Sequence, residues 1–212
     1  MHKRRSLTWI QIGAAAAIFA LAGAASAIPL TIVQEAAGTV GPQSTSNPCV
    51  IAATTCQQPA GLTYTNYTQS GAITSYNELS PLYTAGELAG FGLTTFNIAI
   101  DVNTASGQEN LQLFEVLIGG APAYTFTGPY LIGSVSSNVN GYADWTLRTA
   151  DLSGVAAGTS VQFHAVWNNA SDGGESFFLV STPTRLPEPG TAGLLGLILG
   201  GLALASRKRL RR

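Results

Sequence analysis

The sequence predicts an all-β protein: an antiparallel β-sandwich of jelly-roll-like type, flanked by an N-terminal signal peptide and a C-terminal transmembrane helix. Two observations support the sandwich. Short apolar alternations separated by turn residues fill positions 71–185, and no helical periodicity interrupts them. A third observation concerns the ends, where an apolar run adjoins a cluster of cations on each side of this domain.

The N-terminus has the three-part plan of a secretory signal peptide. Lys3, Arg4 and Arg5 come first, an apolar run follows over about 10–25, and small residues lead up to Ala27. This order is recognised by signal peptidase, so we expect residues 1–27 to be removed after Ala27. The alternative is an uncleaved anchor helix, which the short, alanine-rich run disfavours.

Residues 28–70 are expected to form an irregular arm, because Thr, Ser, Gln, Pro and Ala dominate there and large apolar residues are few. The arm holds the two cysteines of the chain, Cys49 and Cys56. An oxidising compartment favours a structural disulfide between them, and a reduced, inert pair is the alternative. A metal-binding or nucleophilic role has little support, because no histidine lies near them in the sequence.

The sandwich itself is expected over residues 71–185. Along 96–102, apolar residues alternate with Asn97, Ala99 and Asp101, a period of two that turns one face of a strand toward a core. Turn-forming residues such as those of 101–110 separate it from the next strand. In total six to nine short strands are expected, among them 111–118, one beginning near Tyr124, 142–147, 161–167 and 177–180.

An uncharged apolar run at 190–205 predicts the transmembrane helix. Its sixteen residues span roughly 24 Å at about 1.5 Å per residue, which is just enough for a membrane. A basic cluster follows and is expected to stay in the cytoplasm and stop translocation; it consists of Arg207, Lys208, Arg209, Arg211 and Arg212. This cluster argues against the alternative of a buried core helix in a soluble domain.

Directly before the run stands Pro187-Glu188-Pro189, whose prolines favour an extended, exposed peptide at the membrane surface. Pro-Glu-Pro, a glycine-rich apolar span and a terminal arginine cluster together resemble the PEP-CTERM sorting signal of Gram-negative bacteria. The resemblance covers residues 186–212, with Leu186 where the family usually carries Val. It implies recognition and processing by a membrane-embedded exosortase, and it implies an exported protein of bacteria that make extracellular polysaccharide.

Charge narrows the classes of partner. Without the two ends, Arg148 and Arg185 face ten carboxylates, a formal charge of −8, and no lysine remains. Such a surface repels phosphate backbones and anionic headgroups, so we expect no nucleic acid partner. It tolerates neutral sugars, divalent cations and other proteins.

Catalytic chemistry finds little support. His164 is the imidazole that remains in the exported portion, and no Gly-x-Ser-x-Gly motif accompanies it. We expect it on the exposed face of its strand. A glycan hydrolase needs two carboxyl groups at a defined separation, with one kept protonated by burial. The candidates are expected at the surface instead; they are Glu109, Glu115, Asp144 and Glu175.

A hard cation is the better candidate ligand. Two polar, glycine-containing stretches, 101–110 and 168–176, supply oxygen ligands from Asp101, Asn103, Glu109, Asp172 and Glu175. Calcium takes about six to eight such oxygens in irregular geometry, and the loops at one end of a sandwich can provide them. Neither stretch has EF-hand spacing, and the alternative is a pair of turns in which Asn, Asp and Gly satisfy the backbone.

The sequence therefore predicts a non-enzymatic, exported protein of the cell surface or extracellular matrix, acting in matrix, aggregation or adhesion. Its expected partners are signal peptidase, an exosortase-like enzyme, the inner membrane and extracellular polysaccharide. No cofactor is expected apart from the calcium. The alternatives are a carbohydrate-binding module with structural calcium, or a secreted glycan hydrolase. Exposed tyrosines are the expected sugar contacts of such a module; they are Tyr64, Tyr67, Tyr76 and Tyr83.

Overall fold

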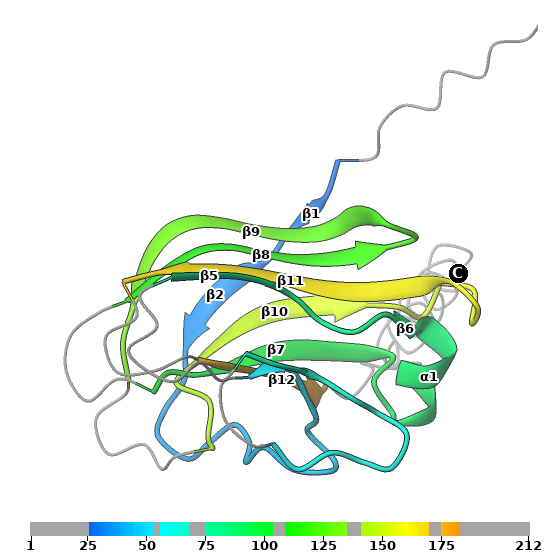
Figure 1. Cartoon of the computed structure of the whole chain (residues 1–212), viewed down its shortest axis with the longest axis horizontal. Coiled ribbons are helices and arrows are strands. Elements are labelled where there is room, and N and C mark those ends of the chain that lie inside the picture. Colours follow the sequence, from blue (N-terminus) through cyan, green and yellow to red (C-terminus); the bar gives the residue numbers. More distant parts are fainter. Residues whose placement is uncertain are drawn as a thin grey trace, which may run out of the picture.

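The computed structural model describes residues 26–52, 56–67, 75–103, 109–134, 141–169 and 175–182. These residues form two six-stranded sheets and one short helix. The sheets lie one above the other in Figure 1 and enclose a continuous apolar core drawn from both. The chain is therefore an all-β protein with the sandwich-like layering that its alternating sequence predicts.

Sheet A is the upper layer in Figure 1 and runs in the order β1-β9-β8-β11-β5, with β6 also paired to β11. Sheet B runs in the order β2-β10-β7-β12-β3-β4. Most pairs are antiparallel, while β1 with β9 and β3 with β4 are parallel. The strands of sheet A are β1 (Ile28–Pro29), β5 (Ser75–Leu79), β6 (Tyr83–Thr84), β8 (Glu109–Ile118), β9 (Ala121–Ile132) and β11 (Ser160–Asn168). Those of sheet B are β2 (Thr31–Gln34), β3 (Cys49–Ala52), β4 (Thr65–Asn66), β7 (Thr95–Asp101), β10 (Trp145–Asp151) and β12 (Ser176–Ser181).

The alternation of β11 shows how the core is built. Val161, Phe163, Ala165 and Trp167 are buried, whereas the residues between them are half-buried on the other face, as the period of two predicts. From β11 of sheet A, the ring of Phe163 packs against aromatic rings of both sheets. Its partners are Phe96 of β7 at 5.9 Å and Phe114 of β8 at 6.4 Å between ring centroids. This aromatic layer joins the two sheets.

The six longest strands, β7 to β12, overlap the six segments predicted as strands, although β10 covers 145–151 instead of the predicted 142–147. The helix α1 (Ala85–Gly90) was not predicted, because its six residues are too few to show a helical period. It begins with a capping box. The Glu87 amide donates to Thr84 Oγ1 at 3.1 Å, and the Thr84 amide donates to Glu87 Oε2 at 2.6 Å. In Figure 1, α1 covers one end of the sandwich.

The expectation of an irregular arm over 28–70 is wrong. Four strands, β1 to β4, lie within this range and pair with strands of both sheets. Val50 and Ile51 are fully buried in the core, and Leu30 is nearly so. Composition concealed these strands because each is only two to four residues long, which leaves no room for a visible period.

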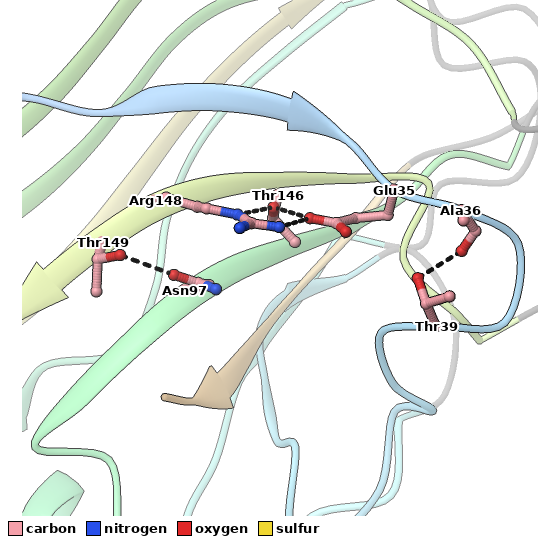
Figure 2. A network of polar contacts seen from close by, with 7 residues as sticks. All are labelled: Glu35, Ala36, Thr39, Asn97, Thr146, Arg148 and Thr149. Atoms are coloured by element: carbon pink, nitrogen blue, oxygen red, sulfur yellow. Dashed lines mark hydrogen bonds and ion pairs between the residues drawn. The ribbon is translucent and has the colours of Figure 1, made fainter. Parts of the chain in front are cut away.

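A polar network fixes the end of β2 on sheet B (Figure 2). Glu35 follows β2, and its Oε1 accepts hydrogen bonds from the Thr146 hydroxyl and from Arg148 Nη2, the latter at 2.5 Å. Nearby, Thr149 Oγ1 lies 3.1 Å from Asn97 Oδ1, between β10 and β7. Because Glu35 joins two side chains of β10, the network reinforces the β2–β10 pairing.

The predicted disulfide is confirmed: Cys49 and Cys56 are bonded, with an S–S distance of 2.00 Å. Both residues are buried in a small apolar cluster outside the main core, which also contains Phe178 of β12. The disulfide therefore fastens the segment after β3 to the outer side of sheet B.

Both predicted targeting segments fall largely or wholly outside the described residues. The signal peptide shares only Ser26 and Ala27 with them, while the span at 190–205 and the basic tail share none. Among the helices that the structure describes, none is long and apolar enough to cross a membrane.

Reducing the disulfide is expected to lower the free energy of unfolding by about 2.5 kcal/mol, because the Cys49–Cys56 bond closes a loop of about eight residues in the unfolded chain. Denaturant unfolding with and without dithiothreitol measures the difference. The double variant Cys49→Ala, Cys56→Ala is the control, and its free energy of unfolding should be the same with and without dithiothreitol. If the wild-type chain unfolds at the same denaturant concentration with and without dithiothreitol, the expectation is wrong.

Candidate functional site

Four buried carboxylates stand at or beside strand ends of the two sheets. In Figure 1 the beginning of β8 lies on the left, away from α1. Glu109 is the first residue of β8 in sheet A, and Glu175 stands directly before β12 in sheet B. Asp101 ends β7, and Asp144 stands directly before β10. Glu109 and Glu175 have no exposed surface, Asp144 is 1% exposed and Asp101 is 8% exposed. We name these four residues the acidic cluster.

Each carboxylate of the acidic cluster accepts a hydrogen bond from a nitrogen donor. Trp167 Nε1 donates to Glu109 Oε2 at 2.8 Å, and the Asn103 amide donates to Glu175 Oε2. The remaining donors are Gln43 Nε2 and the Gly141 amide to Asp101 Oδ2, at 3.0 and 2.9 Å, and the Val102 amide to Asp144 Oδ2, at 2.9 Å. These bonds hold the carboxylates in fixed orientations.

The carboxylates also act on one another. Burial raises the pKa of Glu175 well above its usual range, and the neighbouring Glu109, within hydrogen-bonding reach, raises it further. Burial raises the pKa of Asp101 to about 7, the Gly141 amide opposes this rise, and Asp144 adds to it. The acidic cluster is therefore an electrostatically strained group in which full negative charge is costly.

The side chains of the described residues that can carry positive charge are engaged elsewhere. Arg148 pairs with Glu35 at 2.5 Å, and His164 Nδ1 lies 2.9 Å from Glu115 Oε2. Both contacts lie on outward faces of the sheets. Neither cation is thus paired with the acidic cluster.

One oxygen of the acidic cluster is left without a hydrogen bond. Glu175 Oε1 is buried and has no hydrogen-bond partner. Three aromatic rings pack in series nearby: the ring of Tyr67 is tilted by 31° against that of Tyr76 at 4.7 Å, and Tyr76 stacks on Trp167 at 6.0 Å, between ring centroids. The Tyr67 hydroxyl donates to the main-chain oxygen of Glu175. A buried, unsatisfied carboxylate oxygen is unusual and calls for a positive partner.

Four of the five residues predicted to bind calcium come together here. Glu109 and Glu175 adjoin each other, Asp101 acts on Glu175 electrostatically, and Asn103 contributes its main-chain amide. Asp172 lies outside the described residues. Within the described ranges, no group of three or more His, Cys, Asp or Glu side chains could by itself hold a metal ion. Carboxylate side chains alone therefore do not complete the predicted calcium site.

The surface placement expected for the hydrolase candidates is wrong for three of the four. Glu109, Asp144 and Glu175 are buried, and only Glu115 faces outward. The burial of two could have been predicted: Glu109 precedes the buried Leu111 by two positions, and Glu175 precedes Phe177 by two, so both share the inward face. No comparable signal in the sequence marked Asp144, which joins the acidic cluster through its bond to the Val102 amide.

Of the other predicted placements, that of His164 is confirmed and that of the tyrosines is wrong. His164 lies on the outer face of β11 as expected, with Nδ1 beside Glu115 and Nε2 2.7 Å from Asn77 Oδ1. The tyrosines expected at the surface do not form an exposed platform. Three of the four are buried in the core and Tyr64 is half-buried; the buried ones are Tyr67, Tyr76 and Tyr83. Their rings are large apolar groups that fill the space beside the aromatic layer.

Comparison with known proteins adds no assignment. The chain matches no family model, and neither a curated protein nor a solved structure is detectably similar to it.

Without divalent cations, the stability of the domain is expected to fall as the pH rises. The pKa of Asp101, about 7, exceeds the value of about 3.9 for aspartate in an unfolded chain, so the folded state binds its proton more strongly. The free energy of unfolding is then highest below about pH 4 and declines as the pH rises through about 7. Urea unfolding between these values in EDTA measures the decline.

Asp101→Asn keeps an oxygen acceptor for Gln43 and Gly141 and should make this decline shallower. Asp151→Asn, at an exposed position of β10, is the matched control and should leave the decline between pH 4 and 7 in place. A decline equally steep in wild type and Asp101→Asn would show that Asp101 does not hold the proton.

Proposed function

We propose that this chain is an exported protein of the cell surface or extracellular matrix, with a non-enzymatic role in matrix, aggregation or adhesion. The observation that carries the proposal is the tail, in which Pro187-Glu188-Pro189, an apolar span and a basic cluster follow one another. The three parts have the order of a PEP-CTERM sorting signal. We therefore propose that an exosortase processes the chain at this signal.

The limits of the folded domain support this reading. The first strand begins at Ile28, directly after the expected signal-peptidase site, and β12 ends at Ser181, shortly before the motif. The sandwich thus occupies the interval between the two targeting segments. The Cys49–Cys56 disulfide fits the oxidising compartment that export leads to.

The proposed mechanism is positional. The apolar segment holds the precursor in the inner membrane, with the basic cluster on the cytoplasmic side. The Pro-Glu-Pro peptide presents the processing site at the outer surface of this membrane. The acidic domain is then released or transferred to the cell envelope surface, where neutral polysaccharide is its proposed contact. We also propose that the sandwich has a jelly-roll-like topology, which carbohydrate-binding and matrix modules often use.

A second candidate is a carbohydrate-binding module with structural calcium. The observation that favours it is the acidic cluster, because carboxylates at the loop end of a sandwich are typical of a calcium site. A glycan hydrolase receives less support from the same residues. Glu109 and Glu175 have no exposed surface, and they lie within hydrogen-bonding reach, closer than the separation of about 5 Å or more that glycosidic cleavage requires.

Deleting residues 186–212 tests the sorting proposal. In a bacterial host with an exosortase, the full chain should reach the cell surface, whereas the truncated chain should fold but remain in the soluble periplasmic fraction or the medium. Cell fractionation with detection of the domain measures the distribution.

The substitution Leu186→Val, which supplies the residue usual in the family, is the matched control and should sort normally. If the truncated chain reaches the cell surface as efficiently as the full chain, the tail is not the sorting signal.

A further inference from the structure

We propose that a divalent cation of the calcium type binds between Glu109 and Glu175, beside Asp101 and Asp144. The cation would join the two sheets at the end of the sandwich where β8 and β12 begin. Glu109 begins β8 in sheet A and Glu175 precedes β12 in sheet B. The cation would therefore link one sheet to the other. The inference deepens the calcium-binding candidate but does not depend on the sorting signal.

Burial provides the first reason for a cation. Glu109 and Glu175 have no exposed surface and their carboxyl groups adjoin, so two like charges share a site that water does not reach. Buried carboxylates are stable only when a counter-charge or a proton neutralises them. A bound cation would neutralise the pair without adding a proton to either carboxylate.

The second reason is the unsatisfied oxygen. The Asn103 amide donates to Glu175 Oε2, whereas Oε1 of the same carboxylate is buried without a hydrogen-bond partner. The donor on Oε2 fixes the carboxylate in the way that outer-sphere bonds orient metal ligands. Trp167 Nε1 does the same for Glu109, at 2.8 Å from Oε2. The pair is thus held in place with ligand capacity left on Glu175.

The kind of ion follows from the donor set. Carboxylate oxygens select hard cations, and the soft or imidazole ligands preferred by zinc are absent from the acidic cluster. Calcium takes about six to eight oxygens in irregular geometry, of which two carboxylates supply up to about four. Main-chain carbonyls and water are equally good ligands for the remaining positions. A third carboxylate in direct contact is therefore not required.

Thermal unfolding of the purified domain with calcium and with EDTA is the primary test. At a calcium concentration about one hundred times the dissociation constant, the midpoint should rise by roughly 5 to 10 °C relative to EDTA. Glu175→Gln and Glu109→Gln preserve size and should each remove most of this rise. Glu115→Gln is the matched control: it removes one charge from the same strand, at a residue on the outer face, and should keep the rise.

Terbium luminescence provides a second readout on the unaltered domain. Terbium replaces calcium at oxygen sites and emits when a nearby indole absorbs, and the indole of Trp167 touches Glu109. Excitation of tryptophan should produce terbium emission that saturates at one ion per chain and that calcium displaces. This measurement remains decisive if a glutamine variant fails to fold.

Three outcomes would overturn the proposal. The first is a midpoint that calcium leaves unchanged, and the second is a calcium-induced rise that Glu175→Gln retains. The third is a wild-type domain without saturable terbium emission. Insensitivity to calcium combined with a midpoint that falls as the pH rises would show that the two carboxylates share a proton. None of these outcomes depends on the tail, so a failed sorting proposal would be recognised separately in the fractionation experiment.

Discussion

Face-to-face packing of the two sheets is the constraint on which the rest of the structure depends. The rings of Phe96, Phe114, Phe163 and Phe177 meet between the sheets, with centroid distances of 5.1 to 6.4 Å along the chain of contacts. Once these rings fix the separation of the sheets, residues on the inward face of a strand are buried, whatever their polarity. Glu109 and Glu175 share that face with Leu111 and Phe177. Their burial is thus a consequence of the packing that stabilises the fold.

Period-two alternation predicted strands such as β7 and β11 because it directly reflects one buried and one exposed face. The same reasoning failed over residues 28–70. A strand such as β1, with two residues, cannot show a period, and its place beside β9 is set by long-range pairing. For the candidate site, the sequence indicated Asp101, Asn103, Glu109 and Glu175 as oxygen ligands. It could not show that Asp144 joins them or that Glu175 adjoins Glu109, because these contacts depend on how the sheets stack.

Under the proposed function, the chain has two parts. The ends, a cationic, apolar N-terminus and a Pro-Glu-Pro tail with its basic cluster, would determine its location. The sandwich between them would provide stability and binding outside the cytoplasm. A disulfide and a calcium-type cation would both favour the folded state there, because both are provided by an oxidising, calcium-containing environment. The acidic, lysine-free composition of the domain is compatible with such a cation and with neutral glycans.

Intact-mass spectrometry of the protein recovered from the cell surface tests the account most directly. If both ends are targeting segments, the measured mass corresponds to a chain that begins at Ile28, lacks Arg212 and contains one disulfide. A surface form that retains Arg212, or that still carries residues before Ile28, would contradict the view that the folded domain is delivered by signals removed from its two ends.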